Sequence, residues 1–190
     1  MKIVLFVEGP SDGQSISILA RRMDNRLGLV CRVLPRGDLL NPLKVQTYIH
    51  MDVLQQHPDT KKIILCVDFE CTQENESARI VRSRQEQLSK LVTKPPSFYC
   101  AVVHATESWL VGDEKGLSRY LNQSKISISA VGSVRTACKP KPAMDRLFRR
   151  YQREFSNVRD NPKLAEILDL REVAKNSKSF ARFARLVRDP

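Results

Sequence analysis

Acidic residues follow three of the four apolar, strand-like segments of the chain: Glu8 follows the first, Asp68 and Glu70 the third, and Glu107 the fourth. Because the carboxyl ends of parallel strands share one edge of an open sheet, we expect these carboxylates to converge there. Clustered carboxylates raise one another's pKa, a divalent cation relieves that repulsion, and oxygen ligands suit Mg²⁺ or Mn²⁺ better than zinc. The pattern therefore favours a metal site, although a single strand-end acid is usually a solvated turn or helix cap, and Asp12 alone fits a cap.

The elements that must position these carboxylates alternate between two kinds of pattern. Short apolar runs rich in β-forming residues predict strands at Lys2–Val7 and at residues 29–34, 61–67 and 98–103. Apolar residues at helical spacing predict helices between or after them, at residues 13–26, 43–56, 75–92 and 108–121. This order predicts an α/β fold with right-handed crossovers and a mostly parallel four-stranded sheet flanked by helices.

The pattern changes after residue 122. Ile126 and Ile128 alternate with serines, which indicates a short edge strand, and residues 131–142 fit a basic loop. Three further helices are expected, at residues 143–155, 162–170 and 179–187. We therefore predict a core of residues 1–122 and a basic, mainly helical C-terminal extension of residues 123–190 packed on it.

The charge of the chain is unevenly distributed. The net charge is +11 with a pI near 9.7, yet residues 1–114 are balanced and residues 115–190 carry the whole excess. Such a surface indicates a polyanionic partner, here nucleic acid bound through its phosphates, and the alternative is a solvated helix face. No helix-turn-helix or zinc-finger pattern supports base reading. The candidate phosphate-binding residues are Lys139, Lys141, Arg146, Arg149, Arg150, Arg153, Arg182 and Arg185.

Compartment and membrane association are also indicated by the sequence. No apolar run reaches about 18 residues, so no membrane span is expected, and the N-terminus does not fit a signal peptide. The five cysteines have scattered spacing without a C-x-x-C pair. Free thiols in a reducing cytoplasm are the simplest interpretation.

Several motifs together resemble a known family. The segments VEGPSD (7–12) and VDFE (67–70) resemble the Toprim fold of topoisomerases, bacterial-type primases and OLD-family nucleases. Cys71, residues 107–113 and residues 177–180 add a closer likeness to a Toprim-like family, domain of unknown function 4276. The order of these motifs extends the resemblance from residue 3 to about residue 187. It implies a Toprim-like sheet.

The resemblance also implies an activity, that of a Mg²⁺-dependent (or Mn²⁺-dependent) nuclease acting on DNA or RNA. Asp68 and Glu70 would hold the metal, Glu8 would be a ligand or general base, and Asp12 and Glu107 would complete the shell.

Lys139 or Lys141 would steady the phosphate. Similar small proteins work with ABC/SMC-type ATPases in bacterial antiphage defence, and the chain itself has no Walker-type loop. Glu70 replaces the usual second aspartate, and Ala105 stands where members often have a glutamate. The missing carboxylate keeps open a non-catalytic module that binds nucleic acid or a partner, and nucleotidyl transfer is a weaker alternative.

Overall fold

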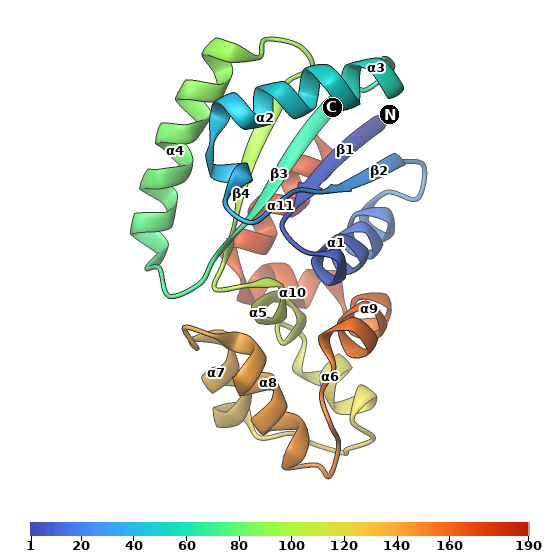
Figure 1. The fold of residues 1–190 in the computed structure, drawn as a ribbon. Helices are drawn as coiled ribbons and strands as arrows, with labels where there is room; N and C mark the ends of the chain where they lie inside the picture. Colours follow the sequence, from blue (N-terminus) through green and yellow to red (C-terminus); the bar gives the residue numbers. More distant parts are fainter. Residues whose placement is uncertain (190) are drawn as a thin grey trace.

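A four-stranded parallel sheet lies at the centre of the computed structural model, which describes residues 1–189 (Figure 1). The strand order is β2-β1-β3-β4, and every neighbouring pair is parallel. The strands are β1 (Lys2–Val7), β2 (Gly28–Val33), β3 (Lys62–Phe69) and β4 (Ser97–Val103). The predicted α/β fold with four parallel strands flanked by helices is therefore confirmed.

The two faces of this sheet are covered by different helices. Alternate side chains such as Val4 and Phe6 pack against α2 (Pro42–Tyr48), a π-helical turn (Ile49–Val53), and α4 (Glu74–Leu91). Side chains between them, such as Leu5, pack on the other face against α1 (Pro10–Met23) and helices from the end of the chain. Because both faces are covered, β1 and β3 are continuous apolar runs, while the edge strand β2 stays half-buried. A 3-10 turn (Asp38–Leu40) and α3 (Leu54–Gln56) complete this half.

Beyond β4 the chain leaves the sheet and then returns to it. Helices α5 to α8 form a lobe beyond the carboxyl ends of the strands, in the lower half of Figure 1. Helices α9 and α11 then pack against α1, and α11 also packs against β4. These elements are α5 (Thr106–Leu110), α6 (Glu114–Tyr120), α7 (Ile128–Arg135), α8 (Pro140–Arg149), α9 (Asn157–Ile167), α10 (Leu170–Asn176) and α11 (Lys178–Arg188).

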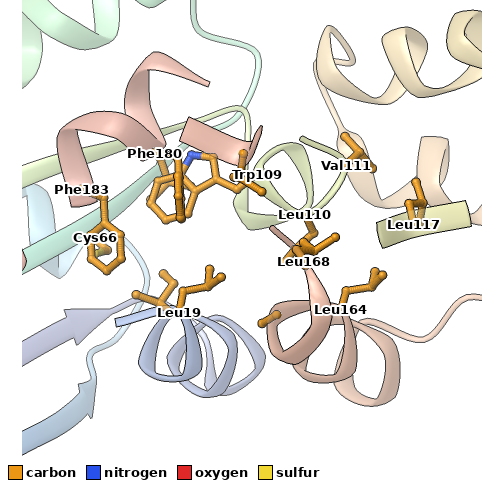
Figure 2. Packing of buried hydrophobic residues seen from close by; sticks show 14 of the residues in the cluster. Leu19, Cys66, Trp109, Leu110, Val111, Leu117, Leu164, Leu168, Phe180 and Phe183 are labelled. Atoms are coloured by element: carbon orange, nitrogen blue, oxygen red, sulfur yellow. The ribbon is translucent and has the colours of Figure 1, made fainter. Parts of the chain in front are cut away.

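An aromatic cluster joins the returning helix to the centre of the molecule (Figure 2). The Trp109 ring centroid lies 5.3 Å from Phe180 in an edge-on arrangement and 5.3 Å from Phe183 in a stacked one. All three side chains are fully buried, and they belong to one apolar cluster that includes residues on both sides of residue 122. This apolar cluster is continuous across residue 122. The predicted division into a core and an extension at this residue therefore stays a prediction.

Several sequence predictions after residue 104 were wrong in detail. The expected helix 108–121 is two helices, because the chain turns at Gly112, where a Cβ would lie 2.9 Å from the Trp109 carbonyl oxygen and from Cα of Val173. The expected edge strand at 126–128 is not formed, because residues 126–127 are irregular and α7 begins at Ile128, and most of the expected loop 131–142 is helical. Ser127 caps α7 by accepting a hydrogen bond from the backbone N–H of Ala130, so a serine in the alternation acts as a helix start.

Residues 1–189 contain no helix that is both long and apolar enough to cross a membrane.

Replacing Phe180 with alanine should lower the free energy of unfolding by about 3–5 kcal/mol, because it removes a buried ring that holds α11 against Trp109. Urea denaturation followed by circular dichroism measures this loss. Val158→Ala, at a side chain that is 67% exposed, is the control and should change stability by under about 0.5 kcal/mol. Equal effects of the two changes would contradict the packing described here.

Candidate functional site

A cavity of about 460 Å³ lies at the carboxyl edge of the sheet, where β1 and β3 end. Two predicted site residues come directly from these strands: Glu8 follows β1, and Asp68 is the last residue but one of β3. Glu70 is the first residue after β3. The lining residues are Glu8, Gly9, Asp12, Arg36, Gly37, Leu40, Asp68, Phe69, Glu70, Thr72, Ile80 and Lys141. Four of the five predicted carboxylates therefore line one cavity.

Asp12 reaches this cavity because α1 begins immediately after β1. A Cβ on Gly9 would lie only 2.7 Å from Oδ2 of Asp12, so the absence of a side chain at position 9 leaves room for this carboxylate. Asp12 is 6% exposed, and within residues 1–189 its Oδ1 has no hydrogen-bond partner. Gly9, rather than Asp12, occupies the N-cap position of α1. Asp12 is thus a buried, incompletely satisfied carboxylate and does not cap the helix.

Asp68 is the electrostatic centre of the site. Burial raises its pKa well above the ordinary value, and the charges of Asp12, Glu107 and Glu8 raise it further. The Lys141 ammonium opposes these effects on the pKa of Asp68. Burial likewise raises the pKa of Asp12, against the opposing charge of Lys141. The predicted carboxylates are therefore close enough to repel one another.

Glu107 approaches the same cluster from α5 and is fully buried. Its Oε1 accepts a hydrogen bond of 2.9 Å from Nδ2 of Asn161, and no partner within the described residues reaches its Oε2. Burial raises the pKa of Glu107, while the Asn161 amide opposes that shift. Asn161 lies on α9 and was missed by the sequence interpretation. Nothing in its local pattern marks it, because only the return of the chain brings α9 to this edge.

Two partly exposed carboxylates of the cavity, Glu8 and Glu70, already have partners. The backbone N–H of Gly37 donates to Oε1 of Glu8 over 3.1 Å, at a φ of 84°, a left-handed conformation that favours glycine. The Arg36 guanidinium lies 3.6 Å from Oε2 of Glu70 and is mostly exposed. Both residues belong to a loop after β2 that carries no acidic signal, and the sequence interpretation did not select them.

Lys141 is the predicted phosphate-binding residue that lines the cavity. It lies in the first turn of α8, which Pro140 begins, and a disulfide between Cys71 and Cys138 joins this segment to the loop after β3. The backbone N–H of Cys71 also donates to the Cys138 carbonyl. The expectation that all five cysteines are free was wrong for these two, because the fold brings together residues 67 positions apart. Lys139 is exposed beside this link.

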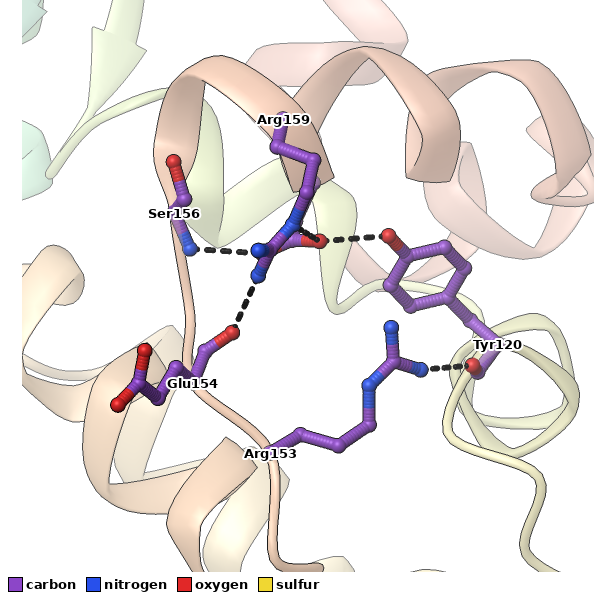
Figure 3. Close-up of polar contacts among 6 residues, drawn as sticks. Tyr120, Arg153, Glu154, Ser156 and Arg159 are labelled. Atoms are coloured by element: carbon purple, nitrogen blue, oxygen red, sulfur yellow. Dashed lines mark hydrogen bonds and ion pairs between the residues drawn. The ribbon is translucent and has the colours of Figure 1, made fainter.

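The other predicted basic residues are not gathered at the cavity. The Arg153 guanidinium donates to the Tyr120 carbonyl and lies 4.8 Å from that ring centroid (Figure 3), so it already has a structural contact, and its phosphate-binding role stays a prediction. Nearby, Tyr120 and Arg159 both bond the buried Asp160, so this region is a structural polar network. Arg149 pairs with Asp145 along α8. Exposed side chains remain at Arg146, Arg150, Arg182 and Arg185.

These residues offer the type of ligand atom that a divalent cation prefers, but they are not arranged as a complete binding site. All donors are carboxylate oxygens, and two of them, on Asp12 and Glu107, are buried without a partner. Within the described chain, however, no three acidic, histidine or cysteine side chains form a ready-made cluster for a metal ion. Glu8 and Glu70 would have to leave the Gly37 N–H and Arg36 to join one.

Replacing Asp68 with asparagine should raise the free energy of unfolding at pH 7 by on the order of 1 kcal/mol in metal-free buffer. The pKa of Asp68 is higher in the folded than in the unfolded protein, so protonation of Asp68 favours folding. This contribution to the free energy of unfolding is complete below the unfolded-state pKa of 3.8 and is lost as pH rises through the folded-state pKa. The stability gap between D68N and wild type should therefore close near pH 4. Denaturation at several pH values measures it.

Asp59→Asn is the matched control, because the hydrogen bond from Lys2 lowers the pKa of Asp59. Because the pKa of Asp59 is lowered and not raised, the Asp59→Asn substitution should not stabilise the protein at pH 7. A destabilised D68N at neutral pH would contradict the electrostatic picture.

Reducing the Cys71–Cys138 bond should lower the free energy of unfolding by up to about 4 kcal/mol, because the bond closes a loop of 67 residues in the unfolded chain. Thermal or urea unfolding with and without reductant measures the difference. A double Cys71→Ser, Cys138→Ser variant should be insensitive to reductant. Five reactive thiols in the unreduced, denatured protein would show that the bond is absent.

Comparison with known families gives one match, which covers nearly the whole chain. The family described as domain of unknown function (DUF4276) matches residues 7–188. No curated protein and no solved structure matches the chain. The matched range includes every carboxylate of the cavity, Lys141 and the returning helices. The chain therefore belongs to the DUF4276 family.

Proposed function

We propose that this protein is a metal-dependent nuclease that hydrolyses phosphodiester bonds of DNA or RNA on a Toprim-like scaffold. The observation that carries the proposal is the convergence of Asp12, Asp68 and Glu107 at one edge of the sheet. Their charges raise the pKa of Asp68, and buried oxygens of Asp12 and Glu107 lack partners. Such a cluster is costly unless a cation binds it, and costly carboxylate clusters are typical of functional sites.

In this proposal Glu8, Asp68 and Glu70 hold Mg²⁺ or Mn²⁺, and Asp12 and Glu107 complete the shell. The ion, when bound, supplies polarisation of the phosphate and a lowered pKa of water. The protein residues orient these ligands: the Asn161 amide fixes Glu107, and the start of α1 fixes Asp12. Glu8 could also accept a proton in this proposal, since it lines the cavity and is only partly buried.

Lys141 would contact the phosphate of the substrate. It lines the same cavity as the carboxylates, and its charge already acts on Asp12, Asp68 and Glu107. Arg146 on α8 and Arg150 directly after it are exposed, and they would provide further phosphate contacts outside the cavity. An ABC/SMC-type ATPase partner and a role in antiphage defence belong to this proposal through the resemblance alone. A cytoplasmic location, expected from the cysteine pattern, also stays a proposal.

A second candidate is a non-catalytic module that binds nucleic acid or a protein partner. The observation that favours it is that Lys141 partly neutralises the carboxylates in place of an ion. Ala105 supplies no further carboxylate, and no ready-made metal cluster occurs in residues 1–189. In this case phosphate binding would not require Mg²⁺.

Cleavage assays separate the two candidates. Plasmid, single-stranded DNA and tRNA are incubated with the protein and Mg²⁺ or Mn²⁺, with Asp68→Asn and Glu8→Gln as variants and Asp59→Asn as the matched control. We expect metal-dependent cleavage that falls at least about a hundredfold in the two site variants and is unchanged in the control. Cleavage that survives in D68N, or no cleavage of any substrate, would refute the nuclease.

A further inference from the structure

A second cavity, of about 280 Å³, lies beside the candidate site on the same edge of the sheet. It begins where β4 ends, at His104, whose backbone N–H donates to the Phe69 carbonyl at the end of β3. Its lining residues come from five helices and from the end of β4. They are Glu74, Val103, His104, Ser108, Arg135, Asn176, Ser177, Lys178 and Ser179. None of the carboxylates proposed to bind metal lines this second cavity.

Two polar groups in this cavity lack partners. Ser108 is 9% exposed, and its hydroxyl has no hydrogen-bond partner within residues 1–189. The buried Nδ1 of His104 is also without a partner there, and His104 has a φ of 70°, an uncommon conformation for a residue with a side chain. Buried polar groups are almost always paired, so unpaired ones beside a cavity point to a missing ligand.

The N-terminus of α11 adds an electrostatic preference. The opposite end of α11 lies near the start of β3, where Lys62 donates to the Leu186 carbonyl, so the first turn of α11 lies at the carboxyl edge. Ser177 caps this turn by accepting from the Phe180 N–H, and Trp109 donates to Ser179 over 2.8 Å. The free N–H groups at a helix start favour an anion.

The charged side chains around the cavity agree with this preference. Lys178 is mostly exposed and lies 3.9 Å from Glu74, a solvated pair that contributes little and can be exchanged for another anion. Arg135 donates to the Val111 carbonyl and to Glu114, which fixes its guanidinium at the wall. Two cations, a helix start, a hydroxyl and an imidazole suit a ligand with several acceptor oxygens.

We propose that this second cavity binds a phosphate group. Its place beside the carboxylate cavity means that it would hold a phosphate other than the one being cleaved. That group is either a neighbouring diester or a monoester at a strand end, and this part rests on the proposed nuclease function. The binding of phosphate itself does not, because Ser108, Lys178 and the start of α11 belong to the second cavity alone.

Titration of ¹⁵N-labelled protein with inorganic phosphate tests the site. We expect amide shifts confined to the first turn of α11 and to residues 104–108, with about tenfold weaker binding in Ser108→Ala and in Lys178→Ala. Lys163→Ala removes one exposed positive charge on α9 and is the matched control, with unchanged affinity. Equal weakening in Lys163→Ala, or shifts elsewhere, would overturn the proposal.

Oligonucleotides then distinguish the two sources of phosphate. A short single strand with a 5′-phosphate should bind more tightly than its 5′-hydroxyl form if the site takes a monoester, and equally if it takes a diester; in both cases Lys178→Ala should weaken binding. If the Lys178→Ala variant binds both oligonucleotides as tightly as the wild type does, the site is refuted. Phosphate binding should persist in Asp68→Asn, so loss of cleavage and loss of this site are separate results.

Discussion

Buried carboxylates that repel one another are the constraint on which the rest of this structure depends. Asp68 is the last residue but one of a strand that is covered on both faces and is itself half-buried, whereas the neighbouring Asp12 and Glu107 are shielded from water. Each loses hydration and gains a like-charged neighbour, which disfavours ionisation at neutral pH. Positive charge at this edge therefore stabilises the ionised carboxylates, and Lys141 supplies part of it.

The fold holds this arrangement by bringing distant segments to one edge. The parallel sheet delivers Glu8 and Asp68 from adjacent strands, and α1 begins early enough to add Asp12. The lobe of α5 to α8 then places Lys141 over the cavity, and the link between Cys71 and Cys138 ties it to the loop after β3. The returning α11, anchored by the aromatic cluster, packs against β4, and α9 packs against α1.

The sheet and its acidic edge could be predicted from sequence because both depend on local signals. Continuous apolar runs rich in β-forming residues mark the buried strands, and parallel pairing alone brings Glu8 and Asp68 together. The contacts of Asn161 and the Cys71–Cys138 pair could not be predicted, because they join segments that are far apart in the sequence and meet only in the folded chain. Arg153 shows the same limit: its charge indicated a phosphate ligand, while its neighbours in space make it a structural donor.

The central claim is that the acidic edge is a cation site, and Mn²⁺ titration observed by nuclear magnetic resonance tests it most directly. The account predicts one saturable site whose paramagnetic broadening is strongest for amides of residues 8–12 and 68–70, with Asp68→Asn abolishing it. Broadening that is absent, or that is centred elsewhere and survives in the Asp68 variant, would contradict it.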